Sequence, residues 1–178
     1  MLRGEKVGLR AQSDDDLPVI QRELSNDVEG SSRAEGRAWR PVAVGSKARQ
    51  AQEDDPKNVQ FSVVELEHGS LIGVASVWGI DTHNRSAHLG LGLLPAARGK
   101  GYGVDVVGAL CRYGFLVRGL QRLQVDTLVD NHAMIRAAER NGFVVEGTLR
   151  SAAWVMGTFI DAALLGLLAH EWTPAPRG

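Results

Sequence analysis

The sequence contains very little cysteine: Cys111 is the only one in 178 residues. A single cysteine excludes an internal disulfide, and it argues against a secreted disulfide scaffold or a zinc site built from cysteines. Long hydrophobic runs are missing as well. No run approaches the roughly 20 residues of a membrane span, and residues 1–6 lack the apolar stretch of a signal peptide. These absences predict a cytoplasmic protein that does not enter a membrane.

An excess of charge of one sign is also missing. The formal net charge is -1, from 20 basic and 21 acidic residues. A protein that binds nucleic acid or an anionic membrane surface usually carries an excess of basic residues, so neither partner is expected. The hydrophobic share of 44% and the charged share of 23% are those of an ordinary globular protein. We expect one domain over residues 1–178, with its core in residues 6–172 and a short C-terminal tail.

Hydrophobic periodicity predicts alternating strands and helices. Strands are expected at residues 6–10, 61–67, 71–79, 86–94, 122–129, 143–148 and 154–168, and helices at 13–24, 104–117 and 130–141. This order predicts an α/β or α+β domain with a mixed central sheet, in which residues 86–129 contain a parallel strand pair with a right-handed crossover. Residues 26–58 are weakly patterned, and only 47–53 reads as a helix. Trp39 in this segment either closes the edge of the core or contacts a substrate.

The most distinctive stretch is a glycine-rich loop between a predicted strand and a predicted helix. Gly99, Gly101 and Gly103 leave the backbone N–H groups unobstructed, and Arg98 and Lys100 add positive charge. N–H groups at the start of a helix bind phosphate because the helix dipole places partial positive charge there. The loop therefore predicts a ligand that carries phosphate.

Two common phosphate-binding loops do not match this stretch. A nucleoside-triphosphate loop needs GxxxxGK followed by Ser or Thr, whereas Leu94 stands at the first glycine position and Gly101 follows the lysine. A dinucleotide loop needs GxGxxG, and the third glycine position holds Val104 or Val106. What remains is the pattern RxxGxG at residues 98–103.

A second pattern lies further along the chain. Residues 130–147 read DNHAMIRAAERNGFVVEG, which predicts a helix capped by Asp130 and Asn131 and ended by Gly142. Together with residues 98–103, this pattern resembles the GCN5-related N-acetyltransferase (GNAT) family, in particular its ribosomal-protein alanine acetyltransferase branch. The resemblance covers essentially the whole chain, including residues 9–17 and 161–172.

The resemblance implies a fold, a co-substrate and binding residues. The fold is the GNAT-like acyl-CoA acyltransferase fold, an α/β (α+β) domain with a mixed, mostly antiparallel central sheet flanked by helices. The co-substrate is acetyl-CoA, and no metal is implied. The implied cofactor-binding residues are Leu93, Leu94, Arg98, Gly99, Lys100, Gly101, Tyr102, Gly103, Asn131 and Arg136. In this picture the loop amides grip the pyrophosphate, and the backbone of Leu93 and Leu94 pairs with the pantetheine arm. Arg136 either approaches the adenosine end or belongs to a solvated helix face.

The implied reaction is attack of a neutral amine on the thioester carbonyl of acetyl-CoA. His88 stands where many relatives have a glutamate, and a histidine that titrates near neutral pH can take the amine proton directly or through water. Strand alternation places His88 on the same face as Gly90 and Gly92. The alternative is a polar strand-edge residue with no catalytic role. Asn131 resembles the family asparagine near the reactive end of the cofactor, and an N-cap role is compatible with that. The predicted catalytic residues are thus His88 and Asn131.

Two positions depart from the family pattern. Ala138 stands where many relatives have a tyrosine that acts as the acid, and Met134 stands where this branch often has serine. Neither side chain can donate a proton. Asp130 and Glu146 are fallback carboxylates for the base.

Two functions are therefore open. The first is an N-acetyltransferase that moves the acetyl group of acetyl-CoA directly to a primary amine, either a protein N-terminus or a small molecule. The second is a non-catalytic acyl-CoA-binding or regulatory module, which the missing acid favours. Residues 154–161 line either the site or the face of a homodimer.

Overall fold

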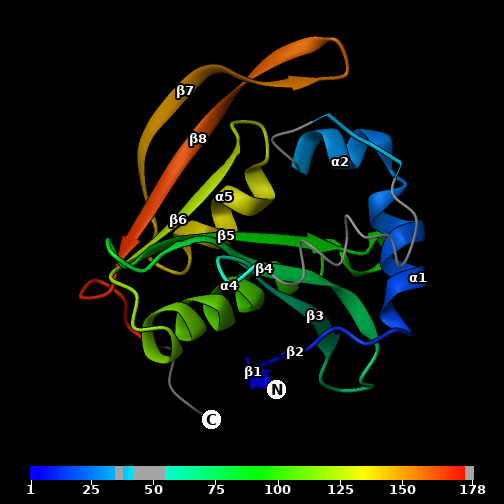
Figure 1. Cartoon of the computed structure of the whole chain (residues 1–178), viewed down its shortest axis with the longest axis horizontal. Helices are drawn as coiled ribbons and strands as arrows, with labels where there is room; N and C mark the ends of the chain where they lie inside the picture. Colours follow the sequence, from blue (N-terminus) through cyan, green and yellow to red (C-terminus); the bar gives the residue numbers. More distant parts are fainter. Residues whose placement is uncertain (35–37, 42–54, 175–178) are drawn as a thin grey trace.

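The computed structural model describes residues 1–34, 38–41 and 55–174 and contains one eight-stranded sheet in the order β1-β2-β3-β4-β5-β6-β8-β7 (Figure 1). The strands are β1 Leu2–Arg3, β2 Val7–Arg10, β3 Val59–Glu65, β4 Leu71–Asp81, β5 Ser86–Leu93, β6 Arg122–Leu128, β7 Val144–Val155 and β8 Thr158–Leu168. Every neighbouring pair is antiparallel except β5 and β6, which are parallel. The predicted mixed, mostly antiparallel sheet is confirmed.

The helical elements lie between the strands. They are α1 Asp16–Ile20, its π-helical continuation η1 Gln21–Ser25, α2 Val28–Ala34, the 3-10 turn η2 Pro95–Ala97, α4 Tyr102–Arg112, its π-helical continuation η3 Tyr113–Val117, and α5 His132–Glu139. Helix α4 packs against β2, β4, β5 and α5. It connects the two parallel strands, as the pattern of residues 86–129 predicts.

The core forms between α4 and the sheet. Val106, Val107 and Leu110 lie on one side of α4 at helical spacing and are fully buried. They share a cluster with Leu123 and Val125, which alternate along β6. Each such side chain contributes about 1.5–3 kcal/mol when it is fully buried, so this layer fixes α4, and the loop before it, against the sheet.

The motif around Asn141 holds α5 against α4. Asn141 Nδ2 donates to the carbonyls of Val104 (2.9 Å) and Ala137 (2.8 Å). Gly142 then ends the helical segment with a φ of 92°, a left-handed conformation that glycine adopts without strain. These contacts give the Asn-Gly-Phe pattern a structural role.

Three predictions about elements were wrong or lie outside the described residues. Helix α2 occupies part of segment 26–58, which the sequence pattern leaves irregular, while the predicted helix at 47–53 lies outside the residues that the structure describes. Strand β7 is longer than predicted and β8 is shorter, because their turn lies at Met156 and Gly157 and not before Trp154. Both turn residues have positive φ, 44° and 92°, which suits a tight hairpin.

The β7–β8 hairpin extends away from the rest of the sheet, at the top of Figure 1. Strand β7 is the edge of the sheet, and nearly all of its side chains are exposed on both faces. Among the described residues, no helix is both long enough and apolar enough to cross a bilayer.

Strands β5 and β6 separate along most of their length. Their pairing is limited to Ser86 with Arg122, Ala87 with Leu123 and His88 with Gln124. Beyond these pairs β5 stays bonded to β4 and β6 stays bonded to β8, so the facing edges of β5 and β6 have no strand partner within the described residues. We call the part of the sheet beyond His88, where β5 and β6 are not paired with each other, the opening; β5 runs along it toward the glycine loop.

Candidate functional site

The glycine loop presents free backbone donors. Gly99 and Gly101 have φ values of 76° and 84°, and a Cβ at either position would meet no atom within 4 Å. Gly101 is the N-cap residue of α4 and makes no side-chain cap, and the N–H groups of Gly99, Lys100 and Gly101 have no acceptor among the described residues. Unpaired N–H groups at a helix start favour an anion. The open glycines leave space for one to approach the backbone closely.

The side chains of the loop take different directions. Arg98 Nε donates to the carbonyl of Leu93 at 3.1 Å, and both Arg98 and Lys100 are exposed. Tyr102 is buried, with 8% of its surface exposed, and its hydroxyl donates to Glu65. Only the backbone of Tyr102 is therefore available to a ligand at the loop, while its side chain anchors the start of α4 to β3.

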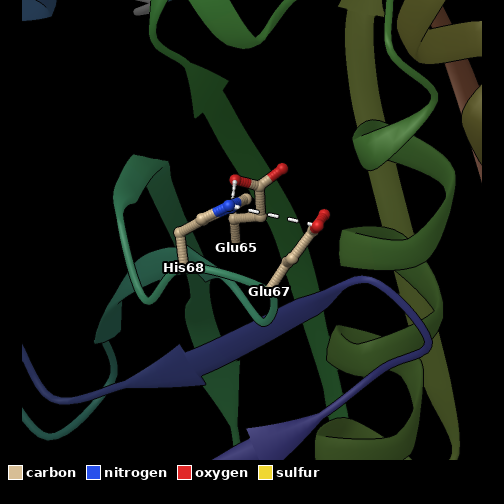
Figure 2. Close-up of side chains that lie close together, drawn as sticks. All are labelled: Glu65, Glu67 and His68. Carbon is tan, nitrogen blue, oxygen red and sulfur yellow. Dashed lines mark hydrogen bonds and ion pairs between the residues drawn. The ribbon is translucent and has the colours of Figure 1, made fainter.

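Glu65 belongs to a small ionisable cluster at the β3–β4 turn. Figure 2 shows Glu65, Glu67 and His68, one ligand atom of each lying within 4.8 Å of the others. His68 Nδ1 is 3.4 Å from Glu65 Oε2, and its Nε2 is 4.0 Å from Glu67 Oε1. The Tyr102 hydrogen bond is the largest cause of the lowered pKa of Glu65. The contacts of this cluster tie the hairpin to the glycine loop.

The two residues predicted to bind through their backbone, Leu93 at the end of β5 and Leu94 just after it, differ in which groups are available. The Leu94 N–H donates to the Ile72 carbonyl at 2.9 Å, and the Leu94 carbonyl accepts from the Ala97 N–H at 2.9 Å. Hydrogen-bonding directions alternate along an antiparallel strand, so the N–H groups of Leu91 and Leu93 point away from β4, toward the opening. Both backbone groups of Leu94 thus make hydrogen bonds inside the protein, whereas the N–H of Leu93 points toward the opening.

His88 lies at the narrow end of the opening. It is the last β5 residue that pairs with β6, and its side chain retains 26% exposure. Its ring stacks on Trp78 of β4, with ring centroids 4.3 Å apart and planes inclined by 22°. Its Nδ1 lies 2.7 Å from Oδ2 of Asp126 on β6. Two neighbouring strands thus hold the imidazole in one orientation.

On the face of β5 that His88 shares with Gly90 and Gly92, the two glycines carry no side chains, and strand alternation predicts this arrangement. A Cβ at Gly90 would lie 3.0 Å from Ser76 Oγ and 3.6 Å from Trp78 Nε1, and one at Gly92 would lie 3.7 Å from Leu24 Cδ1 of η1. Leu89, on the opposite face, is buried in the core. The two glycines therefore leave the surface beside His88 low and accessible.

Asn131 acts as a helix cap in the structure. Its Oδ1 accepts from the Met134 N–H at 3.3 Å, and its Nδ2 donates to Thr127 Oγ1 at 2.9 Å. The residue is exposed, and so is Arg136 on α5. The N-cap role is thus present, and it leaves one Nδ2–H and one Oδ1 lone pair without a hydrogen-bond partner in the described residues, so it is compatible with the proposed contact of Asn131 with a cofactor.

The fallback carboxylates are both held in ion pairs. Asp130 accepts from Arg33 of α2 at 2.6 Å, and Glu146 on β7 accepts from Arg122 Nη1 at 2.9 Å. The hydrogen bond from the arginine lowers the pKa of each carboxyl. A lowered pKa makes a carboxylate a weaker base, so His88 is the better candidate.

The family acid positions carry no ionisable group. Ala138 is fully buried in α5, and Met134 is half-buried against the core. Burial also raises the pKa of the Cys111 thiol to about 12, which leaves that side chain protonated and unreactive. Trp39 is half-buried, and its indole N–H donates to the Ser25 carbonyl at 2.8 Å.

Sequence reasoning missed Asp126 and Trp78. Trp78 pairs directly with His88 across β4 and β5, and the alternation of polar residues on β6 puts Asp126 on the same face of the sheet. The alternation was readable from the sequence. The register that brings β6 beside β5 was not, because it depends on how α4 packs.

Comparison with known proteins gives three findings. Residues 6–144 match the family model described as acetyltransferase (GNAT) domain. The chain is 33% identical over 111 residues to YdaF of Bacillus subtilis (strain 168), which is named as a ribosomal N-acetyltransferase. The matched region covers 60% of this chain and 58% of YdaF. The chain is 30% identical over 126 residues to the ribosomal-protein-serine acetyltransferase of Escherichia coli (strain K12), which covers 65% of this chain and 70% of that protein.

A solved structure shares the fold. The spermidine N-acetyltransferase from Vibrio cholerae, in complex with CoA and spermine, superposes with a TM-score of 0.82 at 24% identity. The match covers 93% of this chain and 97% of that one.

Proposed function

Because the chain belongs to the acetyltransferase (GNAT) domain family, we propose that it transfers the acetyl group of acetyl-CoA to a primary amine. The observation that carries this proposal is the opening between β5 and β6. It has free backbone donors at the glycine loop and a partly exposed histidine at its narrow end. The loop end of the opening can bind a phosphate, and the His88 end can take up a proton. A cofactor whose phosphate lies far from its reactive thioester needs both kinds of group, at opposite ends of one site.

The residues present fit acetyl-CoA. The N–H groups of Gly99, Lys100 and Gly101 would hold the pyrophosphate, and the open edge of β5 at Leu91 and Leu93 would bond the amides of the pantetheine arm. The group supplies an activated acetyl thioester. Arg98 and Lys100 add positive charge beside the loop, and Arg136 is placed on the exposed side of α5.

His88 is the proposed general base. Its Nε2 has no hydrogen-bond partner within the described chain and can accept a proton from the incoming ammonium or amine. Asn131 is the second proposed catalytic residue and would bind acetyl-CoA near its reactive thioester end. Met134 and Ala138 supply no acid, so His88 is the single side chain to which we assign proton transfer.

The acceptor we propose is a primary amine, either a protein N-terminus or a small molecule. The relatives named above are associated with both kinds, a ribosomal protein in one case and spermidine in the other. Because these relatives differ in their acceptors, they do not decide between a protein N-terminus and a small-molecule amine as the acceptor of this chain. We further propose one acetyltransferase domain over residues 1–178, because strands from Leu2 to Leu168 join the same sheet.

A homodimer is also proposed, supported by the β7–β8 hairpin. Trp154 and Phe159 pack against each other on this hairpin, with ring centroids 4.8 Å apart, yet 61% and 60% of their surfaces are exposed. Large exposed apolar groups on a long edge strand favour association. A second copy of the chain would cover them.

The test measures CoA release from acetyl-CoA with a panel of amines: spermidine, spermine, and peptides with free N-terminal serine or alanine. The expected result is turnover of at least one amine by the wild type, with a loss of turnover in His88→Ala. Isothermal titration of acetyl-CoA into both proteins is the companion measurement. Tight binding without turnover of any amine would support the alternative, a non-catalytic acyl-CoA-binding module. Absence of binding would remove both functions.

A further inference from the structure

Asp126 is the hydrogen-bond partner of the proposed base. Its Oδ2 lies 2.7 Å from His88 Nδ1, and the two side chains are 31% and 26% exposed. We propose that Asp126 is a positioning residue, which accepts the Nδ1 proton of His88 and thereby keeps Nε2 free to take the proton of the amine. The inference rests on the proposed acetyl transfer, and it assigns a function to a residue of β6 that does not contact the reacting atoms.

The position of the pair in the sheet supports this role. His88 and Gln124 form the last residue pair between β5 and β6, and Asp126 is the next residue on β6 that faces the same side. The hydrogen bond therefore crosses the opening where it begins. A bond at this point fixes the imidazole relative to both strands that border the opening.

Trp78 and Gly79 restrict the ring from the other side. Trp78 stacks on the imidazole at 4.3 Å, and a Cβ at Gly79 would lie only 3.3 Å from His88 Cδ2. Gly79 has a φ of 60° and lies where the register between β4 and β5 shifts. The shift and the missing side chain leave room for the Cδ2–Nε2 edge of the ring. The ring can be held in place while Nε2 stays accessible.

The other charged groups of this face are already paired. Arg122 donates to Glu146 and, through Nε, to Gln124 at 2.8 Å. The side chain of Asp126 makes no hydrogen bond to Arg122 or Gln124. Within the described residues, His88 is its single ion-pair partner. A carboxylate with a nearby arginine that nevertheless bonds only the histidine is explained better by a role in orienting that histidine than by a role in an ion-pair network.

The proton balance is simple. A neutral His88 carries its proton on Nδ1, where Asp126 accepts the hydrogen bond, and its Nε2 lone pair takes one proton from the amine nitrogen. The ring then carries two protons and one positive charge, while Asp126 remains a carboxylate and stabilises that charge. The proton leaves Nε2 to water. The hydrogen bond of one ring nitrogen sets which nitrogen carries the proton in a neutral histidine, so loss of Asp126 changes the tautomer.

The experiment compares wild type, Asp126→Asn and Asp126→Glu. The ¹⁵N chemical shifts of the His88 ring report the tautomer, with His88→Ala used to assign the signals. In wild type we expect the proton on Nδ1, and in Asp126→Asn a shift of population toward a proton on Nε2. We expect the turnover number of Asp126→Asn to fall about 100-fold, the lower end of the range for general acid–base catalysis, because His88 itself stays in place. The KM for acetyl-CoA should stay unchanged, and Asp126→Glu should recover part of the turnover.

Glu171→Gln is the matched control. It also removes one exposed carboxylate, and the amide oxygen can still accept the hydrogen bond that Glu171 takes from the Leu168 N–H at 3.0 Å. Its turnover and the His88 spectrum should match the wild type.

The outcomes separate the two proposals. If wild type turns over no amine, the proposed function fails, while the tautomer measurement still decides whether Asp126 orients His88. If wild type is active and Asp126→Asn keeps both the tautomer and the turnover number, the positioning role is overturned. A raised KM for acetyl-CoA with an unchanged turnover number would also overturn it, since that result assigns Asp126 to cofactor binding.

Discussion

Asp16, buried at the start of α1, accepts two hydrogen bonds from the guanidinium of Arg10, at 2.6 and 2.8 Å. Ser62 Oγ on β3 donates to the same carboxylate at 2.7 Å, and the Ser13 N–H donates at 2.9 Å. The hydrogen bond from Arg10 holds the pKa of Asp16 well below its usual range. One carboxylate thus joins β2, β3 and the first helix.

Replacement of this carboxylate should lower stability. Asp16→Asn leaves Arg10 without its partner, and we expect the free energy of unfolding at pH 7 to fall by about 2 kcal/mol, the scale of hydrogen bonds to a charged group. Urea denaturation followed by fluorescence measures this. Asp15→Asn is the control, because the neighbouring Asp15 is exposed and makes no cap hydrogen bond.

The pH dependence of the same pair has a definite sign. Because the folded-state pKa of Asp16 is depressed, its stabilisation is fully present above the ordinary aspartate pKa of about 3.9 and is lost as the pH falls through the depressed value. The difference between wild type and Asp16→Asn should therefore be largest at neutral pH and shrink in acid. A difference that grows in acid would contradict the assignment.

A glycine pair tests the loop. Gly101 and Gly119 both have positive φ, 84° and 62°, and open space where a Cβ would stand. An alanine in this conformation costs about 1–2 kcal/mol at either position, so Gly101→Ala and Gly119→Ala should lower the melting temperature similarly. We expect only Gly101→Ala to weaken acetyl-CoA binding, by about tenfold, because about 1.4 kcal/mol of binding free energy is lost when the backbone can no longer approach the phosphate closely. Equal affinities in titration calorimetry would place the phosphate elsewhere.

The ion pair between Arg33 and Asp130 tests the attachment of α2. The pair joins α2 to the turn before α5, next to Asn131, and α2 also contacts β7. Its side chains are 35% and 48% exposed, so Arg33→Ala should change the free energy of unfolding by no more than about 1 kcal/mol. Hydrogen exchange measured by mass spectrometry should nevertheless become faster in α2. Arg22→Ala, which removes a local and more exposed pair with Glu23, should leave that exchange unchanged.

The exposed hairpin tests the homodimer. Light scattering after size exclusion should give the mass of two chains for wild type and of one chain for the double variant Trp154→Ser/Phe159→Ser. Leu116→Ser/Val117→Ser removes two side chains that are equally exposed, at 60% and 61%, from a different surface, and should remain dimeric. A single-chain mass for wild type would rule out the dimer at the concentration measured.

Local patterns predict much of this fold. The glycines at 99 and 101, the cap at Asn131 and the end of the α5 segment at Gly142 each depend on a few neighbouring residues, and the structure has them where the sequence indicates. The turn at Met156 and Gly157 was missed because large apolar residues stand on both sides of it, so residues 154–168 read as one stretch rich in strand-forming residues. Helix α2 was missed because its sequence, VEGSSRA, has small and polar residues in place of an apolar stripe.

Contacts that depend on register were not predictable. The pair of His88 with Asp126 requires a three-residue alignment of two strands that are separated by α4 in the sequence. The engagement of Leu94 depends in the same way on where β5 stops pairing with β4. Alternation along a strand predicts on which side of the sheet a side chain lies. It does not predict which residue of the neighbouring strand lies beside it.

The separation of β5 from β6 divides the sheet into a five-stranded and a three-stranded panel, connected by hydrogen bonds over three residue pairs. We call these three residue pairs the seam. Because so few hydrogen bonds connect the panels, a twist of one panel relative to the other would take place about the seam. His88 is the seam residue nearest the opening, and its partner Asp126 belongs to the other panel. The hydrogen bond that we propose to orient His88 therefore also joins the two panels at the end of the seam, and a rotation that widened the opening would lengthen it.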